Sequence, residues 1–214
     1  MVYTDRVDAG RRLARELAKY RGQDAIVLAL PRGGVVVGDE VARTLGLPLD
    51  VIITRKIGAP GNPEYAIGAV AESSKVQLNE QEVEALHVDK AYIAAEVGRQ
   101  RAEIARRKAL YRGSRPMPSL RGKTVLLVDD GIATGFTALA AVVAVRAEGP
   151  AKVVLAVPVA PAASIAELRS KVDELVCPEV PEFFFAIGDF YSDFRQVTDE
   201  EVRACLSAHR DKAA

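Results

Sequence analysis

Two adjacent carboxylates, followed by small and hydroxylated residues, are the most chemically suggestive feature of this 214-residue sequence. Residues 125–137 read VLLVDDGIATGFT, so Asp129 and Asp130 come directly after four apolar residues. Small residues let backbone N–H groups approach a ligand, and the alanine- and valine-rich stretch that follows favours a helix whose N-terminus attracts phosphate. The acids would repel phosphate but can accept hydrogen bonds from hydroxyl groups or hold a cation. The stretch therefore predicts a site for a sugar phosphate.

A second turn with binding potential follows the apolar run at residues 25–30, where Pro31, Arg32, Gly33 and Gly34 stand together. A guanidinium group can bind two phosphate oxygens at once, and glycines allow a close backbone approach. Taken alone, the motif fits a plain tight turn with a solvated arginine equally well.

Two further cations, Arg55 and Lys56, follow the apolar run at residues 49–54. Ligands of open α/β sheets bind beyond the carboxyl ends of the strands. These two side chains therefore either contact the ligand or are solvated charges on a loop.

Residues 125–137 resemble the phosphoribosyl pyrophosphate (PRPP) loop of the type I phosphoribosyltransferases, and LPRGGV at residues 30–35 resembles the pyrophosphate loop of that family. The resemblance implies that Asp129 and Asp130 hold the ribose hydroxyls and take an indirect part in metal binding. Arg32, Gly33 and Gly34 would hold pyrophosphate, joined by Arg55 or Lys56 if these reach it. The remaining PRPP-binding residues would be those of the loop: Gly131, Ile132, Ala133, Thr134, Gly135 and Thr137.

The reaction implied is displacement of pyrophosphate from C1 of PRPP by a nucleophile, with Mg²⁺ held mainly by PRPP itself. Arg32, Asp129 and Asp130 are then the catalytic candidates. The hypoxanthine-guanine branch has an aspartate three residues after the second acid, where this chain has Ala133. An oxopurine acceptor is therefore not favoured, and the acceptor stays unassigned. The family also implies a cis peptide bond between Pro31 and Arg32, and relatives that commonly pair as dimers make a homodimer a candidate.

Candidates for the acceptor site come from the aromatic-rich residues 183–201, because many phosphoribosyltransferases stack the acceptor on aromatic side chains near a terminus. The residues in question are Phe190, Tyr191, Asp193 and Phe194. The alternative is that these aromatic residues pack in the core.

Two other functional classes fit the same sequence. One is a non-catalytic PRPP-sensing regulator that binds nucleic acid, for which the arginine-rich residues 99–112 offer the basic surface. Such a charge run is more often the solvated face of a helix. The other is an unrelated doubly wound phosphate-binding protein.

The elements that would position these residues alternate between buried strands and helices. Apolar runs at residues 25–30, 49–54, 125–128 and 152–159 predict an open, mainly parallel sheet flanked by helices, as in type I phosphoribosyltransferases. We expect one domain over residues 1–214, with a flexible loop, hairpin and helices at about 56–118 and C-terminal hood elements at about 175–210. Residues 57–65 predict a loop, 66–78 a hairpin, and Ser164 with Glu167 a helix cap.

Composition limits the alternatives. Lys plus Arg and Asp plus Glu both total 29, so the formal net charge is zero and nucleic-acid binding is not expected for the chain as a whole. The two cysteines lack metal-ligand spacing and favour a reducing cytoplasm. No run reaches the roughly 18 apolar residues of a membrane span, so we expect a cytoplasmic protein. His87 and His209 are predicted to lie at the surface and are given no role.

Overall fold

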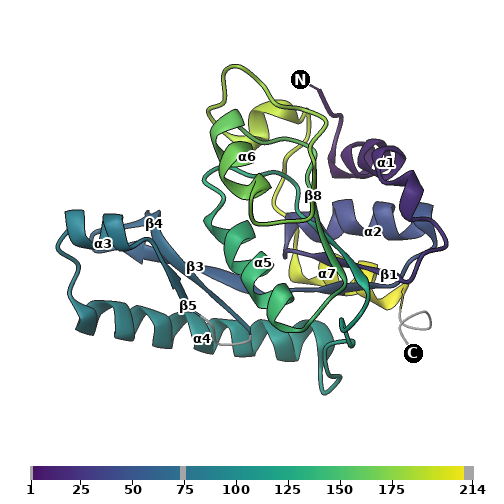
Figure 1. Cartoon of the computed structure of the whole chain (residues 1–214). Helices are drawn as coiled ribbons and strands as arrows, with labels where there is room; N and C mark the ends of the chain where they lie inside the picture. The colour runs from purple at the N-terminus through teal and green to yellow at the C-terminus, as the bar shows by residue number, and fades with distance from the viewer. Residues whose placement is uncertain (1, 73–75, 210–214) are drawn as a thin grey trace.

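The main sheet of the protein is parallel and is made of strands far apart in the sequence (Figure 1). The computed structural model describes residues 2–72 and 76–209. Within them, five strands lie in the order β2 (Leu49–Val51), β1 (Ala25–Ala29), β6 (Thr124–Val128), β7 (Lys152–Ala156) and β8 (Glu174–Val176). Every neighbouring pair is parallel. The predicted α/β fold is confirmed.

Helices cover both faces of this sheet. In β1, Val27 and Ala29 face a cluster that includes side chains of α1 (Arg6–Glu16), α2 (Gly33–Leu45) and α7 (Asp199–Ser207), while Ile26 and Leu28 face α5 (Phe136–Ala147) and α6 (Ala162–Arg169). Figure 1 shows α1 and α2 on one side of the sheet and α5 and α6 on the other. Because both faces are covered, the central strands are apolar throughout rather than alternating with polar residues.

The strand order reverses between β1 and β6. The chain leaves β1 through α2 and returns as β2 on one side, and leaves β6 through α5 and returns as β7 on the other. The two strands end in register, since Ala29 pairs with Val128 and the Leu30 amide donates to the Val128 carbonyl at 2.9 Å. Ligand sites of open α/β sheets lie at such a switch point. The turns after β1 and β6 therefore meet where a ligand is expected.

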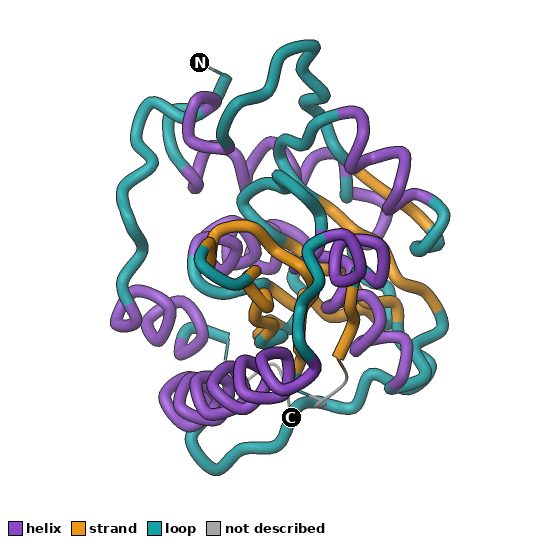
Figure 2. The backbone as a smooth tube through the Cα atoms, turned by 90° about the vertical axis from the view of Figure 1, so that its left-hand side faces the viewer, coloured by secondary structure: helices purple, strands orange, loops and turns teal. Residues whose placement is uncertain are grey.

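A subdomain projects from the main body; we call it the hood, and it is distinct from the C-terminal hood elements expected at about 175–210. It consists of β3 (Thr54–Ala59), β4 (Asn62–Ala71) and β5 (Val76–Leu78) in an antiparallel sheet, with α3 (Glu80–Ala85) and the long α4 (Lys90–Arg112). Figure 2 views the molecule from this side, with the helices and strands of the hood toward the viewer. Short 3₁₀ helices η1 (Ala18–Tyr20) and η2 (Ile187–Phe190) complete the elements. Within the described residues, no helix combines the length and the hydropathy that a membrane span requires.

The loop predicted at residues 57–65 is wrong, because most of it belongs to β3 and β4. The bend is confined to Pro60 and Gly61, whose φ is +75°. Gly58 lies at an irregularity of the strand pairing, where an added Cβ would stand 2.6 Å from Pro63 Cα. The glycine therefore serves a close strand approach rather than a loop. The strands of the hairpin predicted at 66–78 are confirmed, and its turn at 73–75 lies outside the described residues.

His209 was also predicted incorrectly. Its side chain is buried rather than at the surface, and its Nε2 lies 2.7 Å from Asp39 Oδ1 on α2. The residue follows α7, which packs on α2, so its burial depends on a tertiary contact between chain segments 170 residues apart. His87 is exposed as predicted.

A buried arginine fastens the hood to the edge of the main sheet. Arg112 ends α4 with a fully buried side chain, and its Nε donates to Asp50 Oδ1 at 2.9 Å while its Nη1 donates to Glu72 Oε1 at 2.7 Å. Its Nη2 donates to the Val51 carbonyl. The guanidinium thus joins α4 to β2 and to the residue that follows β4.

We predict that Arg112→Ala lowers the free energy of unfolding by about 3–5 kcal/mol, because removing one partner leaves buried carboxylates without a counter-charge. The matched control is Arg99→Ala on the same helix, whose side chain is 61% exposed and pairs with Glu96. That substitution should change stability by less than about 1 kcal/mol. Urea denaturation of both variants measures the difference, and equal effects would contradict the role given to Arg112.

Candidate functional site

The turns after β1 and β6 are in direct contact, and two glycines make this possible. A Cβ added to Gly33 would stand 1.9 Å from Asp130 Oδ2, and one added to Gly34 would stand 2.7 Å from Asp129 Oδ1. The absence of side chains at these positions lets the acidic pair of one turn lie against the backbone of the other. The two motifs found in the sequence therefore lie together at one place.

A cavity of about 320 Å³ opens over the turn that follows β6. The residues that line it come from this turn, from the hood and from the C-terminal segment: Lys56, Ala66, Asp129, Asp130, residues 131–135, Thr137, Ala138 and Ile187. Carboxylates, hydroxyls and a lysine therefore surround one space. These groups can bind the hydroxyls and the phosphate of a sugar phosphate.

Backbone groups of the turn between β6 and α5 are hydrogen-bonded to the chain segment that follows β7. The Ile132 amide donates to the Val159 carbonyl at 2.9 Å, and Ser164 Oγ donates to the Ala133 carbonyl at 2.6 Å. Gly135 precedes α5 with a φ of +81°, a conformation that favours glycine. The predicted cap by Ser164 and Glu167 is wrong, because α6 begins at Ala162 after Pro161 and Ser164 binds the turn instead.

The acidic pair is asymmetric. The Asp130 amide donates to Asp129 Oδ1 at 2.8 Å, whereas Asp130 Oδ2 accepts from Arg6 Nε at 2.6 Å. Burial, and then the charge of Asp130, raise the pKa of Asp129 well above its usual value. One carboxylate thus has a counter-charge from α1, while its neighbour is the one whose ionisation is disfavoured.

The three cationic candidates, Arg32, Arg55 and Lys56, do not all face the cavity. Arg32 Nη1 lies 3.9 Å from Asp199 Oδ1 at the start of α7, and Asp199 Oδ1 also accepts from Tyr111 Oη at 2.5 Å. Arg55 Nε donates to Gln100 Oε1 on α4 at 2.9 Å, whereas Lys56 lines the cavity. The peptide bond between Pro31 and Arg32 is cis, as the resemblance implied.

The four acceptor candidates belong to the C-terminal segment, and their role stays a prediction. Tyr191 is buried with its ring between those of Tyr3 and Phe194, at centroid distances of 5.4 and 4.9 Å, and Phe190 stacks on Phe184. Asp193 accepts from the Arg195 amide.

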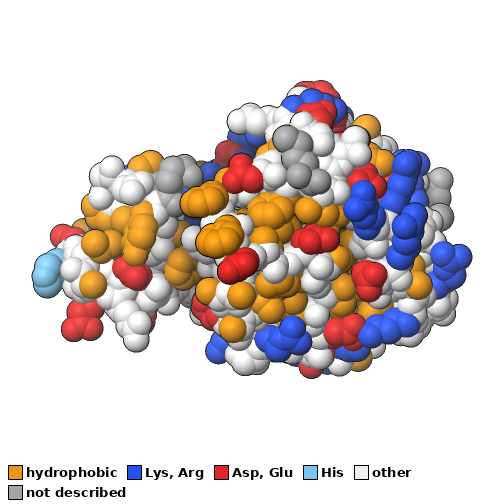
Figure 3. Space-filling view, turned by 90° about the horizontal axis from the view of Figure 1, so that it is seen from above, with side chains coloured by type: hydrophobic (Ala, Val, Ile, Leu, Met, Phe, Trp, Pro, Cys, Tyr) orange, Lys and Arg blue, Asp and Glu red, His pale blue; other side chains and the backbone are white. Residues whose placement is uncertain are grey.

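Among the described residues that line the cavity, the C-terminal segment contributes Ile187. Phe183 and Phe185 of the same segment are exposed, at 73% and 88%. Figure 3 shows one face of the molecule, on which hydrophobic side chains gather with acidic side chains among them.

Sequence reasoning missed three residues that hold the site: Arg6, Tyr191 in its structural role, and Ser164. Tyr191 Oη donates to the Asp130 carbonyl at 2.6 Å. Arg6 lies in a predicted amphipathic helix among many other charged residues. No feature of the sequence distinguishes it from these exposed charges.

Comparison with known proteins agrees with this geometry. The profile of the phosphoribosyl transferase domain matches residues 3–195. The chain belongs to this family. The solved structure of the protein TT1426 from Thermus thermophilus is similar, with a TM-score of 0.82, 46% sequence identity, and coverage of 98% of this chain and 99% of that one.

Curated relatives from two strains of Mycobacterium tuberculosis carry the provisional name phosphoribosyl transferase. Each is 46% identical over 213 residues, which is 99% of this chain and 48% of the relative. The chain thus spans about half the length of these relatives.

Gly33→Ala should displace Asp130 and weaken ligand binding at the acidic pair, because the added methyl group overlaps the carboxylate. The control is Gly98→Ala in α4, where an added Cβ meets nothing within 4 Å and should raise stability by about 0.5–1 kcal/mol. Thermal denaturation compares the stability of the two variants, and calorimetry with PRPP, the ligand that the resemblance implies, compares their affinity. A Gly33→Ala variant with unchanged affinity would contradict the contact.

Asp129→Asn should make the protein more stable than the wild type at neutral pH. Folding raises the pKa of Asp129, so the folded state binds the Asp129 proton more tightly than the unfolded state does. Protonated Asp129 therefore adds to stability below its ordinary pKa of 3.8, and this contribution is lost as the pH rises from 3.8 through the raised pKa of the folded state. Asparagine removes that loss, so the advantage of the variant should shrink as the pH falls toward 3.8. Urea denaturation across this pH range measures the effect, and a variant less stable than the wild type at neutral pH would contradict it.

Proposed function

We propose that this phosphoribosyl transferase domain displaces pyrophosphate from C1 of PRPP with a nitrogenous base, in a reaction that requires Mg²⁺. The observation that carries the proposal is the contact of the two turns at the β1–β6 switch point, with the acidic pair between them. One turn suits a sugar phosphate and the other suits pyrophosphate, and PRPP carries both groups on one ribose.

The turn after β6 would bind the ribose 5-phosphate end of the substrate. Residues 131–135 bring backbone to the cavity wall, and Thr137 adds a hydroxyl in the first turn of α5. The N-terminus of α5 favours a negative charge there. Asp129 and Asp130 would accept hydrogen bonds from the ribose hydroxyls, which fixes the sugar beside the phosphate.

The turn after β1 would hold the leaving group. The bond from C1 to the pyrophosphate oxygen breaks with its electron pair moving to pyrophosphate, while the nucleophile forms its bond to C1. Arg32 lies in this turn and Lys56 on the cavity wall, so both can stabilise the charge that develops on the departing oxygens. Most of the catalysis then comes from orientation and electrostatics, with the hood excluding water.

Mg²⁺ would take most of its ligands from PRPP. Among the described residues, no group of three or more His, Cys, Asp or Glu side chains is arranged to hold a metal ion, and Asp130 Oδ2 is already paired with Arg6. Asp129 and Asp130 would take an indirect part in holding the cation beside the substrate. When bound, it would neutralise charge on the leaving pyrophosphate.

The acceptor side of the site favours a nucleophile other than an oxopurine. The hypoxanthine-guanine branch of the family that the sequence resembles has an aspartate that handles a purine proton at this position, where this chain has Ala133. The Ala133 carbonyl is engaged by Ser164. The arginine-rich part of α4 gives little support to a regulator that binds nucleic acid, because several of its arginines are paired with glutamates. Arg99 pairs with Glu96, and Arg106 and Arg107 pair with Glu103. These are contacts between neighbouring turns of one helix.

Calorimetry with PRPP and Mg²⁺, followed by pyrophosphate release across a panel of bases, tests the proposal. We expect binding by the wild type and release with at least one base. Asp130→Asn should weaken PRPP binding about tenfold or more, because charge-assisted hydrogen bonds contribute about 1.5–3 kcal/mol each. Asp24→Asn, a 73% exposed carboxylate paired with Lys123, is the control and should leave affinity unchanged.

Two outcomes would contradict the proposal. Absence of PRPP binding would remove it altogether. PRPP binding without pyrophosphate release, together with salt-dependent binding to RNA or DNA, would replace it with the regulator.

A further inference from the structure

We infer that Arg6 is a positioning residue for the ribose-binding acidic pair: it fixes the Asp130 carboxylate and cancels one of two adjacent negative charges. This inference rests on the proposed function, because Arg6 would affect activity by changing how PRPP binds. Of the residues that line the cavity over the turn after β6, Asp130 is the one to which Arg6 donates a hydrogen bond. The effect of Arg6 on PRPP is therefore exerted through Asp130.

The Arg6 guanidinium is held on its edges and on its face. The Arg6 side chain is 10% exposed, its Nε donates to Asp130 Oδ2 at 2.6 Å, and its Nη1 donates to the Arg195 carbonyl at 2.8 Å. Its central carbon lies 3.9 Å from the centroid of the Phe194 ring. A guanidinium constrained in three directions has little freedom to turn away from Asp130.

Asp130 is also held through its backbone. Tyr191 Oη donates to its carbonyl at 2.6 Å, and Tyr191 is joined to the N-terminal segment because the Ser192 amide donates to the Tyr3 carbonyl at 2.9 Å. The N-terminal and C-terminal segments therefore converge on Asp130, where Arg6 binds the carboxylate and Tyr191 binds the backbone carbonyl. Such support is what a residue needs if it must hold a ribose in one orientation.

The charge of Arg6 matters as much as its shape. PRPP is strongly anionic, and two uncompensated carboxylates beside it would repel it. The groups that face the pair are Arg6 from α1, Tyr191 from the C-terminal segment and Lys56 from the hood. Burial and the charge of Asp130 raise the pKa of Asp129, and the charge of Arg6 opposes them. Without Arg6, that pKa should rise further.

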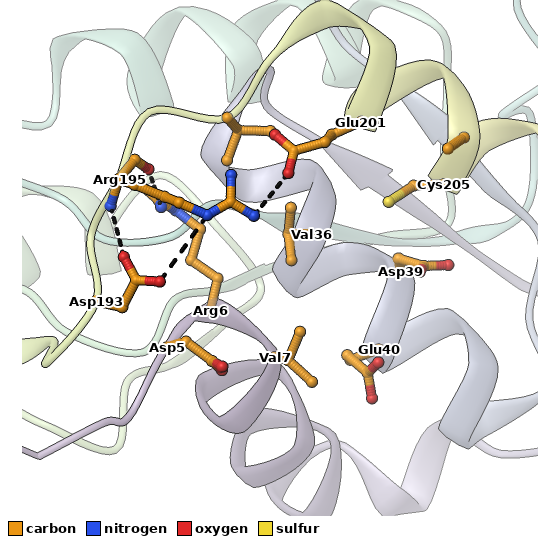
Figure 4. Close-up of a pocket in the computed structure, with 12 residues that line it drawn as sticks. Asp5, Arg6, Val7, Val36, Asp39, Glu40, Asp193, Arg195, Glu201 and Cys205 are labelled. Carbon is orange, nitrogen blue, oxygen red and sulfur yellow. Dashed lines mark hydrogen bonds and ion pairs between the residues drawn. The ribbon is translucent and has the colours of Figure 1, made fainter.

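A second cavity beside Arg6 makes a direct test feasible. It has a volume of about 330 Å³, lies between α1, α2 and α7, and is lined by Arg6 together with apolar side chains such as Val36 and Val197. Figure 4 shows Arg6 at the wall of this cavity, close to Arg195, which pairs with both Asp193 and Glu201. A small guanidinium ion has room to reach the position that an Arg6→Ala variant would vacate.

The experiment compares Arg6→Ala, Arg6→Lys and Arg11→Ala by PRPP calorimetry at several pH values. Arg6→Ala should weaken PRPP binding about tenfold or more, as expected for a lost charge-assisted contact. Arg6→Lys should recover part of the affinity, and millimolar methylguanidinium should restore binding to Arg6→Ala. The control, Arg11, lies on the same helix with a 64% exposed side chain paired with Glu40, and its removal should leave affinity unchanged.

The pH dependence separates electrostatic positioning from structural support. As the pH is lowered, the affinity of Arg6→Ala for PRPP should begin to fall at a higher pH than the affinity of the wild type. Carboxyl NMR should show a higher pKa for Asp129 in the variant than in the wild type. The NMR measurement needs no PRPP. Unchanged affinity in both Arg6 variants, or an unchanged Asp129 pKa, would overturn the inference, whereas failure of the wild type to bind PRPP would overturn the proposed function.

If Arg6→Ala does not fold, Arg6→Lys and Tyr191→Phe carry the test. Tyr191→Phe removes the hydroxyl donor to the Asp130 carbonyl and keeps the ring between Tyr3 and Phe194. It should weaken PRPP binding severalfold without moving the Asp129 pKa as far as an Arg6 change. Wild-type affinity in both variants would also overturn the inference.

Discussion

The close contact of two backbone turns at the ends of adjacent parallel strands is the constraint on which this structure depends. β1 and β6 end in register, so the turns that follow them lie side by side, and side chains on both would clash. Gly33 and Gly34 resolve the conflict because they carry no side chain where Asp129 and Asp130 lie. The cost is a pair of neighbouring carboxylates in a confined place, and the Arg6 side chain supplies the opposing charge. Fold, cavity and electrostatics thus follow from one packing arrangement.

The main sheet could be predicted from the sequence because burial on both faces leaves a plain signature. The apolar runs at residues 25–30 and 125–128 have no polar interruption and match β1 and β6 closely. The hood was harder to predict, since glycine and proline at residues 57–65 indicate a loop by composition. In the structure, Gly58 accommodates a close strand approach and the bend falls on Pro60 and Gly61. Composition alone does not distinguish these uses of glycine.

The site was predictable only where its chemistry is continuous in sequence. The turn after β6 carries acids, small residues and hydroxyls within nine positions, and the turn after β1 carries its arginine and glycines in three. The supports come from elsewhere: Arg6 lies 124 residues from Asp130, and Tyr191 lies 61 residues from it. Ser164 was given to a helix cap because its spacing to Glu167 fits one, yet its hydroxyl binds the Ala133 carbonyl. Such contacts depend on how helices dock, which local patterns do not encode.

A crystal structure of the protein with PRPP and Mg²⁺ would show whether the two turns bind one substrate molecule. We predict that the 5-phosphate lies against residues 131–137, the ribose hydroxyls on Asp129 and Asp130, and the pyrophosphate at residues 31–34, all from one molecule. PRPP bound elsewhere, or bound with its ribose turned away from the acidic pair, would contradict the claim that the two turns form a single site.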